Sequence, residues 1–275
     1  MEKSEMTEGV SLSRAIDALI QAKQLANRRP VYIKSLRAYL AQFSKGRESL
    51  LIGSFDVFAI EDWFASRKES TSTRASNVGR LSSLFSFCER RGWVNRNPCK
   101  MLERPRIEYK PPRILTPEQA HKLISASKTD RPHMLPFFAL GMFCGIRPDE
   151  LSKLHWDSID LEQRIVSVDA SVSKVRQRRV VPIYPEVAEL LRLGGRLPVS
   201  RTTRKRYIGF ACAVLGLIDW PTDTLRKTCA SYMLARERDA GRVSTALGNS
   251  PRILMTNYAE LVNPSASTAF WSIRP

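Results

Sequence analysis

The first third of the chain shows a helical pattern of apolar and polar positions. Four segments carry this pattern: residues 11–27, 30–43, 54–67 and 73–93. In the last of these, Val78, Leu81 and Leu84 recur at helical spacing and form an apolar face opposite several arginines. Segments with the two-residue alternation of a strand are absent from this part of the sequence. The pattern therefore predicts a small N-terminal bundle of four helices.

A proline-rich and basic stretch follows the helical pattern. It reads ERPRIEYKPPRIL and holds three prolines and four basic residues in thirteen positions. Such a composition favours an extended, semi-rigid segment over a helix. We therefore expect a helical domain over residues 1–103, a basic linker over residues 104–115 and a second domain over residues 116–275.

The expected second domain begins with a clear helix signal. Thr116 is suited to cap the helix and Pro117 to occupy its first position. A buried helix is expected at residues 133–144, and VAELLRLGG ends in a glycine that would stop a further helix. Most of this domain is therefore expected to be helical.

Two valine- and isoleucine-rich segments interrupt the helices. RIVSVDAS and RRVVPIY have the composition of strands, and the polar segment VSKVRQ joins them. This arrangement predicts a β-hairpin. The expected fold class is thus mainly α with a small antiparallel β-sheet.

The charge of the chain narrows its possible partners. Lys and Arg number 44 against 27 Asp and Glu, which leaves a formal net charge of +17. An excess of this size favours a polyanion as partner. Because the basic residues are spread through both halves, nucleic acid fits better than a membrane surface. The alternative is a basic soluble protein without such a partner.

The remaining composition argues against metal and membrane chemistry. The five cysteines are odd in number and never form a CxxC pair, and the three histidines do not cluster. The longest apolar run, residues 134–146, is too short to span a bilayer, and the polar N-terminus does not resemble a signal peptide. We expect a cytoplasmic protein with no metal site, no small-molecule cofactor and no membrane association.

Several basic residues lie where they could bind phosphate. In GIRPDEL, Arg147 follows a turn and precedes a helix whose first N–H groups favour an anion. Lys174 and Arg176 lie at the expected hairpin tip, and Arg226 lies near the start of a later helix. Each could instead be an ordinary surface residue, or cover apolar surface with its stem.

The order of the motifs carries more weight than any one of them. GIRxxEL is followed by a basic hairpin with RRVVPI, then xxLRKT, then LGN, and then Tyr258, nine positions after Asn249. In this order the motifs resemble the tyrosine recombinase, or phage integrase, family. The resemblance covers the whole chain: the part up to about Arg104 resembles the family's core-binding (SAM-like) domain, and the part from about Arg113 resembles its catalytic domain.

The resemblance implies a site-specific recombinase or integrase. It assigns Arg147 and Arg226 to the scissile phosphate and Lys174 to protonation of the leaving 5′-hydroxyl. Tyr258 would be the nucleophile that forms a 3′-phosphotyrosyl intermediate. This chemistry needs neither metal nor nucleotide, because the phosphotyrosine conserves the bond energy. Type IB topoisomerases share it, but the chain length and the N-terminal bundle favour a recombinase.

The resemblance also implies partners. The expected partner is double-stranded DNA, and the free protein would be a monomer or weak oligomer that forms a tetramer on DNA. Candidate DNA contacts are Arg176, Arg178, Arg201, Arg204 and Lys205. The C-terminal segment 262–275 carries Phe270, Trp271 and Ile273, and we expect it to dock on a neighbouring protomer. The alternative is docking on its own domain.

Two positions depart from the family pattern. Asp223 and Asn249 stand where the family usually has histidine. The amide of Asn249 can still donate a hydrogen bond, but an ionised Asp223 cannot donate and would repel phosphate unless it paired with Lys227 or Arg226. These departures leave open a catalytically weakened or inactive DNA-binding protein, acting as a regulator or architectural factor. An unrelated basic RNA-binding protein is a third class, but it would require the motif order to be accidental.

Overall fold

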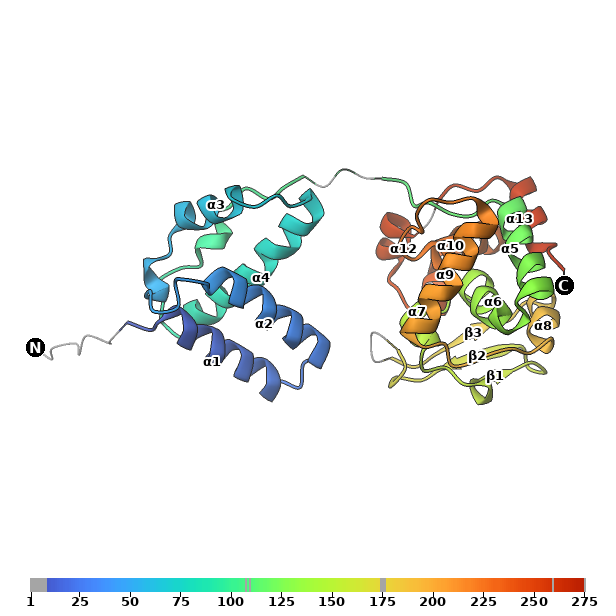
Figure 1. Ribbon diagram of the computed structural model, residues 1–275, viewed down its shortest axis with the longest axis horizontal. Coiled ribbons are helices and arrows are strands. Elements are labelled where there is room, and N and C mark those ends of the chain that lie inside the picture. The colour runs from blue at the N-terminus through green and yellow to red at the C-terminus, as the bar shows by residue number, and fades with distance from the viewer. Residues whose placement is uncertain (1–8, 107, 109, 174–176, 259, 275) are drawn as a thin grey trace, which may run out of the picture. The chain divides into compact units, whose positions relative to one another are not determined.

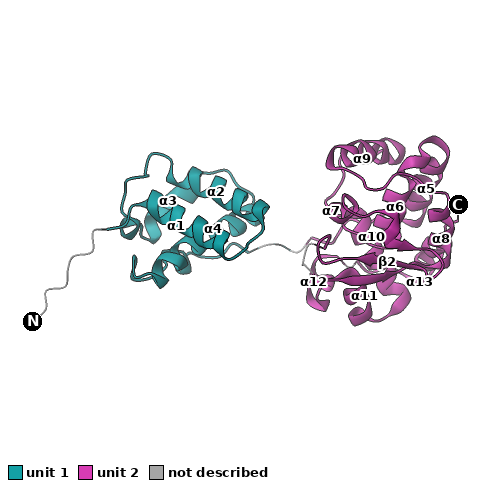
Figure 2. Ribbon diagram, turned by 90° about the horizontal axis from the view of Figure 1, so that it is seen from below, with its two compact units in different colours: residues 1–109 teal, residues 110–275 magenta. Residues whose placement is uncertain are grey.

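The computed structural model of the chain describes residues 9–106, 108, 110–173, 177–258 and 260–274. The chain divides into two compact units, residues 1–109 (unit 1) and residues 110–275 (unit 2), which Figure 2 distinguishes by colour. Each unit has an apolar core of its own. The division falls inside the basic, proline-rich segment.

Unit 1 is a helical bundle, as the apolar pattern predicted (Figure 1). Its helices are α1 (Leu12–Leu25), α2 (Pro30–Ser44), α3 (Val57–Ala65) and α4 (Thr71–Arg90), with short 3-10 turns at Ile52–Ser54 and Pro98–Lys100. Side chains of Ser11, Asp56 and Ser70 cap α1, α3 and α4 by accepting from a backbone N–H in the first turn. These caps satisfy donors that have no partner within the helix, so they fix where each helix begins.

The core of unit 1 forms where the apolar faces of these helices meet. Leu19 of α1, Leu40 of α2 and Leu81 of α4 are fully buried. Phe43 and Trp63 add an edge-to-face pair with ring centroids 5.1 Å apart. Aromatic pairs of this geometry stabilise a core beyond the area they bury.

Unit 2 is mainly helical and includes one small sheet (Figure 1). Its helices are α5 (Pro117–Asp130), α6 (Leu135–Phe143), α7 (Pro148–Leu151), α8 (Pro185–Arg192), α9 (Arg201–Leu215), α10 (Thr224–Glu237), α11 (Ala240–Leu247), α12 (Pro251–Asn257) and α13 (Pro264–Trp271). Its strands are β1 (Ile159–Asp160), β2 (Ile165–Val168) and β3 (Arg179–Pro182), and short 3-10 turns occur at Pro132–Met134 and Trp156–Ser158.

The sheet is antiparallel in the order β1-β2-β3, and Val166 of β2 pairs with Val181 of β3. The predicted hairpin is therefore present, and β1 extends it by a strand that the sequence pattern did not reveal. Helix α6 is buried along its whole length and packs against α10. The expected fold class, mainly α with a small antiparallel sheet, is confirmed.

The C-terminal segment differs from our expectation. Phe270, Trp271 and Ile273 are buried in the core of unit 2 and do not form an exposed apolar tip. The Phe270 ring stacks on Tyr232 of α10, with centroids 3.9 Å apart and planes 8° from parallel. The Trp271 indole N–H donates to the Tyr232 carbonyl oxygen at 3.1 Å. The expected docking on a neighbouring protomer is therefore wrong for this structure, because the segment's own domain buries these side chains.

None of the helices found within the described ranges combines the length and the apolar character needed to cross a bilayer.

Candidate active site

Arg147 lies just after a turn that requires glycine at position 145. Gly145 has φ +61°, and a Cβ there would lie 2.4 Å from Leu247 Cδ2. Both the backbone conformation and the close approach of Leu247 therefore require glycine at this position. Arg147 follows as the N-cap residue of α7, and Pro148 takes the first helical position, as the sequence predicted.

We expected the first N–H groups of α7 to help bind an anion, and this expectation is wrong. The helix has four residues, and the Glu150 carboxylate accepts the Arg147 backbone N–H at 3.0 Å. Because a protein carboxylate already occupies this N–H, the anion-binding capacity here rests on the Arg147 guanidinium.

That guanidinium is nearly buried and held from two sides. Arg147 Nη1 donates to Glu150 Oε1 at 3.1 Å. Arg147 Nη2 donates to the Gly248 carbonyl oxygen at 2.9 Å and to Asn249 Oδ1 at 2.7 Å. The motifs GIRPDEL and LGN, about a hundred positions apart in sequence, therefore meet at one side chain.

Arg226 lies in the first turn of α10 and is 1% exposed. Its guanidinium donates to the carbonyl oxygens of Gly145 and Leu247. Its Nε is buried and has no hydrogen-bond partner in the described part of the chain. Burial, and next the charge of Arg147, lower the pKa of Arg226 to about 10. The site therefore favours an added negative charge.

Tyr258 follows α12 directly and is half-buried. Its backbone N–H donates to the Leu254 carbonyl oxygen at 3.0 Å, and its own carbonyl oxygen accepts from Ser231 Oγ of α10 at 3.3 Å. The Tyr258 ring centroid lies 5.2 Å from Arg226 Cζ. The backbone contacts thus fix the tyrosine beside the second arginine.

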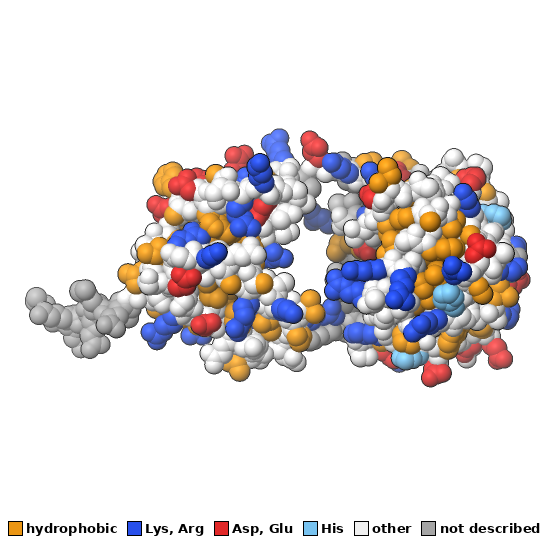
Figure 3. All heavy atoms as spheres, viewed as in Figure 1, with side chains coloured by type: hydrophobic (Ala, Val, Ile, Leu, Met, Phe, Trp, Pro, Cys, Tyr) orange, Lys and Arg blue, Asp and Glu red, His pale blue; other side chains and the backbone are white. Residues whose placement is uncertain are grey.

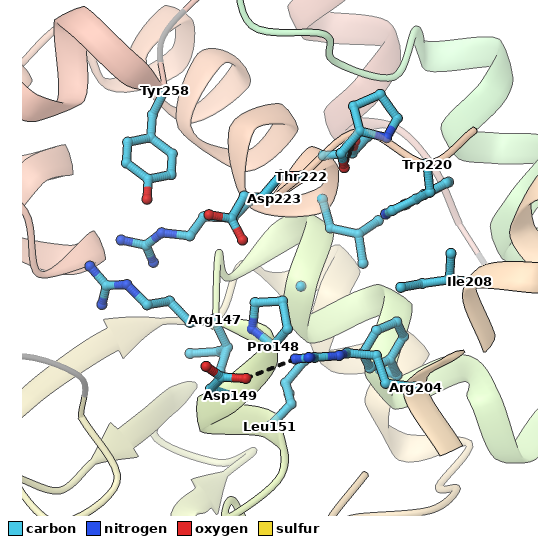
Figure 4. Close-up of a pocket in the computed structure, with 17 residues that line it drawn as sticks. Arg147, Pro148, Asp149, Leu151, Arg204, Ile208, Trp220, Thr222, Asp223 and Tyr258 are labelled. Atoms are coloured by element: carbon cyan, nitrogen blue, oxygen red, sulfur yellow. Dashed lines mark hydrogen bonds and ion pairs between the residues drawn. The ribbon is translucent and has the colours of Figure 1, made fainter. Parts of the chain in front are cut away.

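A cavity of about 340 Å³ brings these groups together. Arg147, Arg226, Tyr258 and Asp223 line it, with apolar side chains of α6, α9 and the turn before α10. Figure 4 shows the side chains of Tyr258, Asp223 and Arg147 turned into the same space. Both arginines and the tyrosine predicted from the motifs therefore share one cavity.

Asp223 is half-buried and lies in the left-handed region, at φ +59°. It precedes α10 as the N-cap residue, yet its side chain makes no capping hydrogen bond. Among the described residues its carboxylate forms no ion pair, so the pairing with Lys227 or Arg226 considered above is not observed. The cavity therefore contains a carboxylate without a cationic partner from this part of the chain.

Asn249 acts on Arg147 and does not line the cavity. Its Oδ1 accepts from the arginine, whereas its Nδ2 is buried and finds no partner among the described residues. The amide therefore retains two N–H donors that could serve a phosphate oxygen.

The expected DNA contacts differ in their surroundings. Lys174 and Arg176 lie outside the described residues. Arg178 is exposed, with its Nε 3.8 Å from Asp169 Oδ1. Arg201 and Lys205 are exposed on α9, and Arg204 is half-buried and donates to Asp149 Oδ1 at 3.0 Å. Figure 3 shows a dense group of Lys and Arg side chains on one side of unit 2.

Arg179 and Glu150, which the motifs did not identify as site residues, are central to the site. Arg179 of β3 is 8% exposed, and its Nη1 and Nη2 donate to the two oxygens of Glu150 at 3.0 and 2.6 Å. The alternation in RVVPI carries a signal that could have found it, since Arg179 shares its face with the buried Val181. An arginine on the core side of a strand requires a buried acceptor, and Glu150 supplies it.

Burial opposes ionisation of Glu150, but hydrogen bonding and the charge of Arg179, followed by the N–H and charge of Arg147, outweigh it. The pKa of Glu150 consequently lies below its ordinary value. Glu150 is therefore an anion shared by two arginines, and not only a complement to the helix dipole as its place in GIRPDEL suggested.

Within the described ranges no group of three His, Cys, Asp or Glu side chains is arranged to hold a metal ion.

Comparisons with known proteins agree with the motif order. A sequence model of the phage integrase family matches residues 113–193. The tyrosine recombinase XerC of Roseiflexus castenholzii is 25% identical over 284 positions, which cover 90% of this chain and 89% of the relative. The tyrosine recombinase XerD of Neisseria meningitidis serogroup A is 28% identical over 123 positions, 44% of this chain and 41% of the relative.

Solved structures show the same fold at low identity. The chain matches a lambda integrase dimer bound to a COC′ core site with a TM-score of 0.70 and 15% identity, covering 95% of each chain. It matches the Tn1549 transposon integrase in complex with transposon right end DNA with the same TM-score and identity, covering 94% of this chain and 98% of the other. The fold, the motif order and the sequence matches together support membership of the tyrosine recombinase family.

Proposed function

We propose that this chain is a site-specific DNA recombinase that cuts and rejoins duplex DNA through a covalent link to Tyr258. One observation carries the proposal. Arg147, Arg226 and Tyr258 come from three separate segments, and all three line one cavity. The named relatives, XerC and XerD, are tyrosine recombinases, which supports this reading.

The two arginines provide the electrostatic part of the proposed reaction. Their donors and charges would bind the non-bridging oxygens of a phosphodiester, where charge redistributes as the fifth oxygen approaches phosphorus. A phosphate in the cavity would also provide a negative counterion for the buried guanidinium of Arg226. Because protein hydrogen bonds already hold both guanidinium groups, little reorganisation would be needed at the moment of reaction.

In the proposed cleavage step, the Tyr258 phenolic oxygen attacks phosphorus. A P–O bond to tyrosine forms and the P–O5′ bond breaks, which leaves a 3′-phosphotyrosyl link and a free 5′ end. The phenolic proton passes to solvent water, and Lys174 delivers a proton to the departing 5′ oxygen. Attack by the 5′-hydroxyl of another strand reverses these changes and rejoins the DNA.

The proposal extends to the other parts of the chain. We assign the helical segment 1–103 as the core-binding domain, residues 104–115 as a basic linker and residues 116–275 as the catalytic domain. Duplex DNA is the proposed partner, with four protomers assembled on it. The DNA named in the structures of lambda integrase and the Tn1549 integrase supports the choice of partner.

The test is capture of a covalent protein–DNA adduct. Nicked duplexes built from DNA that flanks the gene would lose the short 5′ fragment after cleavage and trap the intermediate. We expect a denaturant-resistant adduct with the wild type and none with Tyr258→Phe, which removes only a hydroxyl. DNA binding and thermal stability should be nearly equal in the two proteins. If the wild type binds these duplexes without forming an adduct, the chain is a DNA-binding relative without turnover.

A further inference from the structure

Three consecutive carbonyl groups at the end of α11 accept hydrogen bonds from three different arginines. Arg179 Nε donates to the Ala246 oxygen at 3.1 Å, Arg226 Nη2 donates to the Leu247 oxygen, and Arg147 Nη2 donates to the Gly248 oxygen. The last carbonyls of a helix have no partner within it and carry its partial negative charge. The end of α11 is therefore a shared attachment point for the arginine cluster.

Arg179 differs from the other two arginines because it does not line the cavity. All three of its guanidinium nitrogens donate within the protein, two of them to Glu150 and one to Ala246. Because each nitrogen is bound to Glu150 or Ala246 and Arg179 lies outside the cavity lining, its described contacts are with the protein and not with the space where a phosphate would bind.

Glu150 connects Arg179 to Arg147. Its Oε1 accepts from Nη1 of both arginines, and its Oε2 accepts from the Arg147 backbone N–H and from Arg179 Nη2. Glu150 is 1% exposed, so water cannot replace a lost partner easily. Without Arg179 the carboxylate would have one cation left, Arg147, and would attract it more strongly.

We infer that Arg179 is a positioning residue for the cleavage reaction. By binding Glu150, it limits the hold of this carboxylate on Arg147 and leaves the Arg147 guanidinium free to reach Gly248 and the cavity. By binding Ala246, it also fixes the turn that carries Asn249. The inference rests on the proposed function, because it concerns the rate of attack by Tyr258.

The test compares single-turnover rates of adduct formation on a nicked duplex, with DNA affinity measured separately. We expect Arg179→Met to slow adduct formation about 10²-fold, the scale of a small misplacement of a reacting group, while DNA affinity stays nearly constant. Adding Glu150→Gln should restore most of this loss, because glutamine can still accept the Arg147 N–H but no longer competes for its charge. Arg192→Met is the matched control, since it removes an exposed arginine at the end of α8 that does not line the cavity.

The rescue separates positioning from a merely structural role. If Arg179 only stabilised the fold, the double variant would be no faster than Arg179→Met, and that outcome would overturn the inference. A wild-type rate for Arg179→Met would do the same. Thermal unfolding identifies variants that do not fold, and for these Arg179→Lys with and without Glu150→Gln gives the same comparison. Absence of an adduct from the wild type would instead contradict the proposed function.

Discussion

At the scale of single residues, Asp223 is the side chain that fits the proposed chemistry least well. It lines the same cavity as Tyr258 and Arg226, and its carboxylate has no cationic partner among the described residues. An ionised carboxylate accepts hydrogen bonds only, so it would repel a phosphate that needs donors. We expect it to limit the rate of cleavage.

We expect Asp223→His to be a faster enzyme than the wild type. A histidine at this position could donate to the phosphate, and one well-placed group of this kind contributes ~10² to 10⁴ in rate. Adduct formation on a nicked duplex should therefore become faster, and adding Asn249→His should increase it further, although the two effects need not be additive. The increase should disappear with Tyr258→Phe.

Asp223→Asn is the matched control, because it removes the charge and adds an amide donor with little change in size. We expect it to be faster than wild type and slower than Asp223→His. A fall in rate with both substitutions would show that the carboxylate takes part in the reaction and would contradict our interpretation.

Some residues of the candidate site could be predicted from the sequence, and others could not. The motif order named Arg147, Arg226 and Tyr258, and the structure brings these three together. The motif order did not identify Arg179 as part of the site, since an arginine beside other arginines near a hairpin tip has the pattern of a solvent-exposed charge. Its partner Glu150 lies 29 positions away, and only the register of β3 places both in the core.

At the scale of elements, α13 is the part that the sequence placed wrongly. Phe270 is fully buried, stacks on Tyr232 and has its ring centroid 4.9 Å from that of Phe143. We predict that Phe270→Ala lowers the free energy of unfolding of unit 2 by about 3–5 kcal/mol, because it removes a large ring and leaves a cavity. Chemical denaturation measures this loss.

Thr268→Ala provides the control, since Thr268 is exposed on the same helix. It should change the stability only slightly. Unchanged stability of Phe270→Ala, together with weaker cooperativity between two protomers on adjacent half-sites, would restore the original expectation that this segment docks on a neighbour.

The helices differ in how far the sequence determines them. In α1 and α4 the apolar spacing and a serine cap act within one segment, so both could be predicted from local pattern alone. In contrast, the apolar residues Phe270 and Trp271 indicate from sequence only that these side chains will be buried against some surface. Whether the chain or a neighbour supplies the partner depends on the position of Tyr232, which is distant in sequence.

At the scale of the whole molecule, the net charge of +17 is the property that most directly predicts behaviour. Proteins that neutralise phosphates with Lys and Arg release counterions, so the logarithm of the binding constant falls linearly with the logarithm of salt concentration. We therefore expect a steep salt dependence for duplex DNA. The linker residues Arg104, Arg106, Lys110 and Arg113 should contribute to it, together with Arg201 and Lys205, which are exposed on α9.

Basic residues of α9 can contribute to DNA binding through local contacts or only through the general charge of the chain. Replacing Arg201 and Lys205 of α9 with alanine should reduce the magnitude of the slope by about 1 per residue, because each removed contact neutralises one phosphate fewer. Replacing Lys122 and Lys128 with alanine removes the same charge from exposed positions on α5, which contributes no side chain to the cavity. Binding isotherms over a range of salt concentrations give both slopes. Equal reductions would mean that α9 has no special role in DNA binding, and a flat salt response of the wild type would contradict DNA binding through the phosphate backbone.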